Sequence, residues 1–243
     1  MAERRPIDVL RDSGGQIDVG ADDDRSPVKD MCVINNSMHV IKSQGIYRVQ
    51  LADEIDPDRT NPAIPNIHQR VLAYGADCNL VRQTLMTAER LFHPKLLGQT
   101  FAYERAIDLS FEALKDLMVM HEMQLRLAAE LEAAEASLKG MTVQNRALSV
   151  PTIGGVGVAV ETFLQKADHA VADLFEITKL FYPESVGKRW FESLFDLAKA
   201  NYGPDATFTK FLAEALPVLK LVRNARNCVG VRSKVMQSCC GFL

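Results

Sequence analysis

The spacing of apolar and polar residues changes character near residue 66. Between Met31 and Leu51, β-branched and aromatic residues are interrupted by the triplets "NNS" and "SQG", which predicts two or three short strands. The next stretch, "DEIDPDRTNPAIPN", contains three prolines and predicts an irregular connector up to residue 66. The preceding segment 1–29 is polar and rich in Gly and Asp, so we expect it to be disordered.

After residue 66 the apolar residues recur with helical spacing. This pattern predicts a long helix over 101–139, whose apolar stripe includes Ile107, Leu114 and Leu125. Four further helices are expected over 67–92, 158–180, 186–201 and 207–229, the last kinked at Pro217. The sequence therefore predicts an all-α fold: a helical bundle over 67–229, with a small β-hairpin-like appendage over 30–66.

The charges are distributed unevenly around a net charge of −3. Residues 186–243 hold 9 Lys and Arg against 4 Asp and Glu, so a polyanion would be attracted to this part of the chain. No apolar run approaches the ~18 residues that a membrane span requires, and the first residues do not resemble a signal peptide. The five cysteines lack the spacing of metal ligands, so we expect reduced thiols, a cytoplasmic location, no metal and no cofactor.

Three short motifs suggest chemistry but lack required residues. "GGVGVAVE", residues 154–161, lacks the spacing of a dinucleotide or phosphate loop and predicts an interhelix turn. His121 begins an HExxH-like pattern, but Leu125 stands at the second histidine position, so a core histidine is expected. The terminal "CGFL" formally matches a prenylation signal at Cys240, although Gly241 is not aliphatic.

The stretch "LVRNARNCVGV", residues 221–231, combines arginine with asparagine inside an apolar helical pattern. On a helical wheel, Arg226 continues the row of Leu212 and Leu219, about 40° from the seam through Val222. A guanidinium on that apolar stripe needs a carboxylate, a phosphate or an exit to water, because an unpaired buried charge is unstable.

Two interpretations of this segment remain open from spacing alone. In the first, two cations near a helix C-terminus interact favourably with the helix dipole, and Arg226 extends its head group into water. In the second, Arg226 and Arg223 form an anion site between helices that suits phosphate, with the Asn227 amide beside them.

The segment "RNARNCV" at the end of a helical bundle resembles the signature of HEPN domains. These are all-α modules of prokaryotic toxins, defence systems and RNA-processing enzymes. The connector "VQLADEIDPDRTNPAIPN" is similar to a segment that precedes such bundles in uncharacterised prokaryotic proteins. The resemblance covers residues 35–229 and implies a HEPN-like bundle that pairs as a homodimer, with both motifs lining one cleft.

The resemblance also implies metal-independent RNA cleavage. The family motif is an Arg, a polar residue and, a few residues later, a His that acts as general acid or base while the Arg stabilises the phosphorane. The motif places Arg226 and Asn227 in the catalytic position. The residues it assigns to RNA phosphate are Arg223, Asn224, Arg226 and Arg232.

The histidine of the motif is expected at position 231, where this chain has Val231. Valine cannot transfer a proton, so cleavage by the family mechanism should be lost or severely weakened. In similar proteins "RNARNCV" continues into Glu-His-Pro, whereas here helical apolar spacing fades after residue 229. We therefore hypothesise that the tail 230–243 is a frameshifted or truncated terminus.

The first functional hypothesis is a homodimeric RNA- or nucleotide-phosphate-binding protein, related to endoribonucleases but with an incomplete catalytic motif. The alternative is a non-catalytic interaction module, in which the long helix 101–139 docks a protein partner through "RLAAELEAAEASLK". An enzyme of unrelated chemistry has no support in the sequence.

Overall fold

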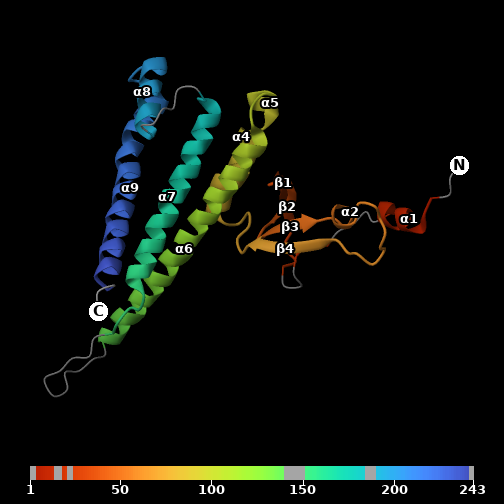
Figure 1. Cartoon of the computed structure of the whole chain (residues 1–243), viewed down its shortest axis with the longest axis horizontal. Helices are drawn as coiled ribbons and strands as arrows, with labels where there is room; N and C mark the ends of the chain where they lie inside the picture. The colour runs from red at the N-terminus through yellow and green to blue at the C-terminus, as the bar shows by residue number, and fades with distance from the viewer. Residues whose placement is uncertain (1–3, 14–17, 21–23, 140–150, 184–189, 241–243) are drawn as a thin grey trace. The chain divides into compact units, whose positions relative to one another are not determined.

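The computed structural model describes residues 4–13, 18–20, 24–139, 151–183 and 190–240, with side chains described up to Cys228 (Figure 1). The chain forms two compact units, Met1–Phe111 and Glu112–Leu243. Helix α6 (Tyr103–Lys139) contributes its first residues to one unit and the rest to the other.

The expected all-α fold is wrong. Helices make up 63% of the structure, but 12% lies in a four-stranded antiparallel sheet, so the fold is mixed and helices dominate. The sheet is a complete small β-structure rather than a hairpin-like appendage. Its strands follow one another in chain order, each paired with the next.

The first three strands coincide with the segment whose pattern predicts short strands. They are β1 (Val28–Ile34), β2 (Ser37–Lys42) and β3 (Ile46–Gln50), with Met31 opposite Val40 and Val40 opposite Tyr47. The β1–β2 turn consists of two asparagines, both with positive φ, at 49° and 55°. Asparagine tolerates this left-handed conformation, which a two-residue hairpin turn requires.

The fourth strand corrects the helix expected over 67–92. Residues Ile67–Leu72 form strand β4, which pairs with β3 through Val49 opposite His68 and Tyr47 opposite Arg70. Helical structure begins only at α3 (Asn79–Val81) and continues through the π-helix η1 (Arg82–Met86) into α4 (Thr87–Leu91). The long-range pairing with β3 therefore outweighs the local helical spacing of these residues.

One face of the sheet packs against helices of the same unit. Short helix α5 (Pro94–Leu97) precedes α6, and His39 lies 5.4 Å from the Phe111 ring, measured between centroids. The backbone N–H of Asn35 donates to the Asp108 carboxylate at 2.7 Å, which fixes the β1–β2 turn to the first turns of α6. The fully buried side chains of this unit come from strands and helices alike: Ile34, Ile41, Ile46, Tyr47, Val49, Val81, Leu85 and Ile107.

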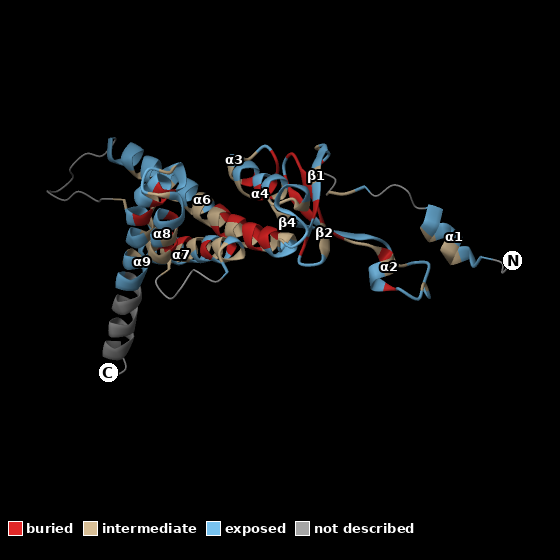
Figure 2. Cartoon of the chain, turned by 90° about the horizontal axis from the view of Figure 1, so that it is seen from above, coloured by how far each residue is buried: buried red, intermediate tan, exposed pale blue. Residues whose placement is uncertain are grey.

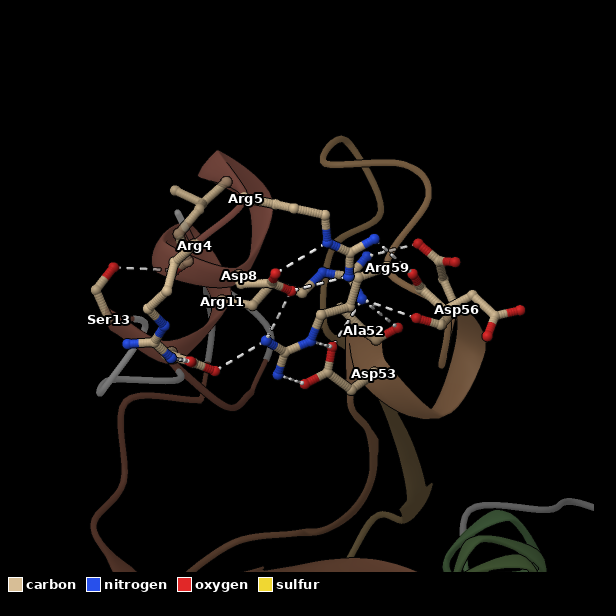
Figure 3. A network of polar contacts seen from close by, with 12 residues as sticks. Arg4, Arg5, Asp8, Arg11, Ser13, Ala52, Asp53, Asp56 and Arg59 are labelled. Carbon is tan, nitrogen blue, oxygen red and sulfur yellow. Dashed lines mark hydrogen bonds and ion pairs between the residues drawn. The ribbon is translucent and has the colours of Figure 1, made fainter. Parts of the chain in front are cut away.

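The N-terminal segment, expected to be disordered, contains helix α1 (Pro6–Ser13). None of the residues of α1 is buried, and Val9 and Leu10 are 51% and 57% exposed, so apolar packing does not hold the helix in place. Its contacts are ionic and reach the connector after β3, which includes helix α2 (Ala52–Ile55) (Figure 3). Arg59 of the connector, for example, pairs with Asp8 at 3.4 Å and with Asp12 at 2.9 Å.

Arg11 forms the centre of this ionic contact, and its side chain is 8% exposed. Its guanidinium donates to five oxygens of the connector: Ala52 O, Asp53 Oδ1, Asp56 O, Asp56 Oδ2 and Asn61 O. The Asp56 carboxylate also accepts from the backbone amides of Thr60 and Asn61, which lower its pKa to about 2. The Pro-rich connector is therefore irregular, as expected, but held by side-chain hydrogen bonds.

A second polar cluster lies buried beside the sheet. Asp24 accepts hydrogen bonds from Ser26 and, at 2.5 Å, from the Tyr47 hydroxyl, while the Lys42 ammonium donates to the Asp24 and Val19 carbonyls. Burial alone would raise the pKa of Asp24, but these hydrogen bonds and the Lys42 charge lower it to about 2. Hydrogen bonds and the ion pair between them therefore compensate the buried charges of Asp24 and Lys42.

The second unit is helical. The expected helix start at residue 186 lies outside the described residues, and the last helix continues past its expected end at residue 229. Beyond the α6 portion the unit contains α7 (Val156–Phe181), α8 (Phe191–Tyr202) and α9 (Thr207–Cys240). Gly155 at the start of α7 has a φ of 68°, and "GGVG" does form a turn into a helix. Pro217 lies inside α9, which continues past it as one helix. No helix in the described residues is long and apolar enough to cross a membrane.

The core of the second unit joins α7, α8 and α9. Buried residues of all three helices form one cluster: Phe175, Phe191, Leu194, Ala198, Leu212 and Leu216. Partly buried Trp190 and Leu219 pack against it. On α9, no side chain described between Leu216 and Cys228 is buried, so the part of the helix over 217–228 is largely exposed (Figure 2).

The Asp24 cluster makes the stability of the first unit dependent on acid. Because folding lowers the pKa of Asp24, its stabilisation is complete above the unfolded value of about 4 and is lost as the pH falls towards 2. We expect Asp24→Asn to reduce the free energy of unfolding at pH 7 by about 2 kcal/mol. The decrease of this free energy between pH 5 and 2 should be smaller in the variant than in the unmodified protein. Urea denaturation across this range measures both effects, with the exposed Glu54→Gln as control. An unchanged acid profile in Asp24→Asn would contradict the assignment.

Candidate functional site

A pocket of about 290 Å³ lies between α7, α9 and the residue before α8. The residues that line it carry two guanidinium groups, one carboxylate, one amide and one indole: Asp168, Ala172, Trp190, Arg223, Arg226 and Asn227. Two of these residues, Arg226 and Asn227, are the motif residues singled out in the sequence, and Arg223 is one of the expected phosphate contacts. The pocket lies within the second unit.

Helix α9 brings the two arginines to the same wall. Arg223 and Arg226 are three residues apart, which places them on neighbouring positions of one helix face. The α9 surface is anchored upstream, where Leu212 and Leu216 are buried against α7 and α8. The Lys220 ammonium also pairs with Glu192 of α8 at 3.0 Å, which adds an ionic contact one turn before the pocket.

Trp190 supplies an aromatic wall and is the only tryptophan of the chain. Its indole lies edge-on to Phe191 with 4.8 Å between ring centroids, and Phe175 lies 6.4 Å away. Trp190 has a φ of 60°, a backbone conformation that costs about 1–3 kcal/mol in a non-glycine residue and persists where the surroundings stabilise it. The aromatic packing provides that stabilisation and fixes the indole at the pocket.

Arg223 stacks on this indole. Its guanidinium carbon lies 5.1 Å from the centroid of the Trp190 ring, within the range of a cation–π interaction. In the described part of the chain no carboxylate lies within ion-pair distance of Arg223. Its charge is therefore not neutralised by an acidic side chain there, and the residue is exposed and lines the pocket.

Arg226 is less buried than its place in the apolar row suggested. Its side chain is 51% exposed, and its Nε lies 3.5 Å from Oδ2 of Asp168 on α7. The row Leu212–Leu219–Arg226 does face the other helices, but the apolar core ends before position 226. Arg226 therefore has both a carboxylate partner and access to water, which are two of the three alternatives expected for a guanidinium at this position.

Of the remaining predicted site residues, only Asn224 has a side chain that the structure describes. Asn224 is exposed on α9 and does not line the pocket. The side chains of Arg232 and Val231 lie outside those that the structure describes, although the α9 backbone continues through both positions to Cys240. Thus the tail 230–243 is helical up to residue 240, and its origin as a frameshift or truncation stays a prediction.

Neither histidine of the second unit is among the residues that line the pocket. His121 is half-buried on α6, and His169 is exposed on α7 with its Nδ1 3.6 Å from Asp116 of α6. The Lys166 ammonium pairs with the same carboxylate at 2.7 Å. Among the described residues no group of three or more His, Cys, Asp or Glu side chains is placed to hold a metal ion.

Two residues of the pocket were not identified from the sequence as part of a site. The sequence pattern gave no role to Asp168 or to Trp190. Helical spacing assigns Asp168 to a face of α7, but which helix faces it depends on the packing of α7 against α9. The one available signal for Trp190 was a single tryptophan within the helix expected over 186–201.

Comparison of the chain with protein-family models, with curated protein sequences and with solved structures found no match. The function of the pocket therefore has to be inferred from its own residues.

The stack of Arg223 on Trp190 can be tested by fluorescence, because one tryptophan gives the whole signal. We expect Arg223→Ala to change the intensity and the maximum of the Trp190 emission, since the cation leaves the ring and water replaces it. The free energy of unfolding should fall by about 0.5–1 kcal/mol. Lys220→Ala, on the same helix but outside the pocket, is the matched control. Identical emission spectra of Arg223→Ala and the unmodified protein would show that the stack does not form in solution.

Proposed function

We propose that the pocket binds a phosphate group of RNA or of a nucleotide, and that the protein is an RNA-binding relative of the HEPN endoribonucleases. The observation that carries this proposal is the convergence of Arg223 and Arg226 on one pocket. Guanidinium groups present planar pairs of N–H donors that match phosphate oxygens. The Asn227 amide adds a neutral donor beside them.

The charge of the surroundings supports this choice of ligand. Asp168 offsets the charge of one arginine, so the two guanidiniums and the carboxylate together leave one positive charge at the pocket. The C-terminal part of the chain, residues 186–243, adds an excess of Lys and Arg over Asp and Glu. A polyanion is attracted by such an excess before it makes any direct contact.

The same proposal includes binding without cleavage by the family mechanism. The motif histidine is replaced by Val231. In addition, α9 is a continuous helix through position 231, which puts that position about 140° around the helix from position 226. We further propose, from the resemblance, a cytoplasmic homodimer in a prokaryotic RNA-processing, toxin–antitoxin or defence system.

Replacement of Arg226 tests the proposal. We expect Arg226→Ala to weaken binding of a short single-stranded RNA about tenfold, because one charge-assisted contact is lost. The slope of log K against log salt should also fall by about 0.7, the value for one phosphate contact to a single strand. Fluorescence anisotropy of a labelled oligonucleotide at several salt concentrations measures both quantities.

Lys210→Ala is the matched control, because it removes one charge from the exposed surface of α9 outside the pocket. This variant should retain most of the affinity. The proposal fails if the unmodified protein binds no RNA or nucleotide, or if Arg226→Ala and Lys210→Ala weaken binding equally.

A second candidate function is protein binding by the distal half of α6. Between residues 121 and 139 no side chain is buried (Figure 2). Leu131 and Leu138 are one heptad apart on this helix and are 50% and 40% exposed, and Leu125 is 53% exposed. Leucines at heptad spacing on an exposed helix face are typical of a helix that docks another helix.

The two candidates respond to different variants. If α6 docks a protein, the unmodified chain should capture that partner stoichiometrically from a lysate of the source organism. Leu131→Glu should abolish this capture, because the introduced carboxylate would be buried in the interface. Arg226→Ala should leave that capture intact, and Leu131→Glu should leave RNA binding intact. Affinity purification followed by mass spectrometry, with circular dichroism to check folding, measures the difference. Capture that persists in Leu131→Glu excludes this face of α6 as the docking surface.

A further inference from the structure

Asp168 is the one residue of the pocket that an anion site alone does not explain. A carboxylate in a phosphate site repels the ligand, so its position calls for another role. The Asp168 side chain is 28% exposed, and its contact to Arg226 joins Oδ2 to Nε at a distance of 3.5 Å. Within the described residues Oδ1 has no hydrogen-bond donor, so the carboxylate retains acceptor capacity that opens into the pocket.

The stack of Arg223 on Trp190 offers a surface for a planar ring. Bases in single-stranded RNA stack on aromatic rings and on guanidinium planes. The indole carries the guanidinium on its face, and the guanidinium belongs to an exposed side chain. The pocket volume of about 290 Å³ lies at the lower end of the range for small-molecule sites, which suits one nucleotide better than a longer ligand.

A carboxylate distinguishes the four RNA bases by their hydrogen-bond donors. Guanine presents two adjacent donors on its Watson–Crick edge, the ring N1–H and the exocyclic amino group, and both can donate to the two oxygens of one carboxylate. Adenine and cytosine place a ring acceptor beside their amino group, and uracil flanks its single N–H with two carbonyl oxygens. An ionised carboxylate has only acceptors, so it pairs fully with guanine alone.

We propose that Asp168 makes this pocket selective for guanine: the base stacks on the Arg223 guanidinium, its Watson–Crick edge donates to Asp168, and Arg226 binds the phosphate. This inference rests on the proposed function, because it assigns the ligand of the same site. Arg226 then has two roles, since its charge also offsets the repulsion between the Asp168 carboxylate and the phosphate.

Titration with four nucleotides tests the selectivity. Emission of Trp190, confirmed by isothermal titration calorimetry, follows binding of guanosine, adenosine, cytidine and uridine 5′-monophosphates. We expect the guanine nucleotide to bind about tenfold more tightly than the other three, the value of a charge-assisted hydrogen bond at a partly exposed site. Inosine 5′-monophosphate, which lacks the amino group, should bind with intermediate affinity.

Asp168→Asn separates selectivity from overall charge. The amide offers one acceptor and one donor, so the ratio of guanine to adenine affinity should fall to about one, even if removal of the negative charge strengthens phosphate binding to both. Glu176→Gln is the matched control: it removes one carboxylate from the same helix, where Glu176 pairs with Lys179 at 2.6 Å outside the pocket. This control should keep the tenfold ratio.

The outcomes distinguish this inference from the proposed function. Equal affinities for the four nucleotides, or an unchanged ratio in Asp168→Asn, would overturn guanine selectivity while phosphate binding stands. Equal affinities for guanosine and its monophosphate would support base recognition and overturn the phosphate site. If neither the nucleotides nor inorganic phosphate binds, both proposals fail.

Discussion

The packing of α9 against both α7 and α8 decides whether the pocket exists. Phe175 of α7 and Phe191 of α8 form one apolar cluster with Leu212 and Leu216 of α9, and Trp190 packs on its edge. This cluster holds the indole, and it sets the rotation of α9 about its axis. That rotation in turn places Arg223 over the indole and Arg226 opposite Asp168. The polar geometry of the pocket is thus a consequence of apolar packing about two to four turns away along α9.

In both units charged side chains are paired with opposite charges or hydrogen-bonding groups, but the two sets of groups differ in burial. In the first unit Asp24 and Lys42 are almost fully buried, and each is compensated by several hydrogen bonds at short distance. In the pocket the contacts are longer, and Arg226 and Asp168 remain partly exposed. Buried pairs of the first kind specify a structure, because breaking them leaves an uncompensated charge. Loosely paired groups of the second kind can exchange partners with a ligand at little cost.

Helical spacing was sufficient to predict α6 and the first part of α9, whose apolar residues recur over many turns, and the "NNS" triplet located the β1–β2 turn. It did not predict that α9 continues past the expected end at residue 229 to Cys240. Helical spacing was insufficient for β4, because Ile67–Leu72 becomes a strand through pairing with β3. The long Pro-rich connector separates the two strands in the sequence, so local spacing does not indicate this pairing. The direction of Arg226 was also readable from spacing. Its exposure and its partner were not, since both depend on where the apolar core ends and on which residue of α7 lies opposite.

The attachment of α1 to the connector has a different physical basis from the packing of the sheet. The helix buries no residue of its own, and Arg11 holds it through five oxygens of the connector. Hydrophobic packing is largely insensitive to ionic strength. The Arg11–Asp56 pair is buried and is screened little, whereas the pairs of Arg59 with Asp8 and Asp12 join partly exposed charges, which are screened within about 10 Å at 0.1 M salt. The N-terminal helix is therefore joined to the connector in part by ion pairs that respond to the salt content of the surroundings, whereas the apolar packing of the sheet does not.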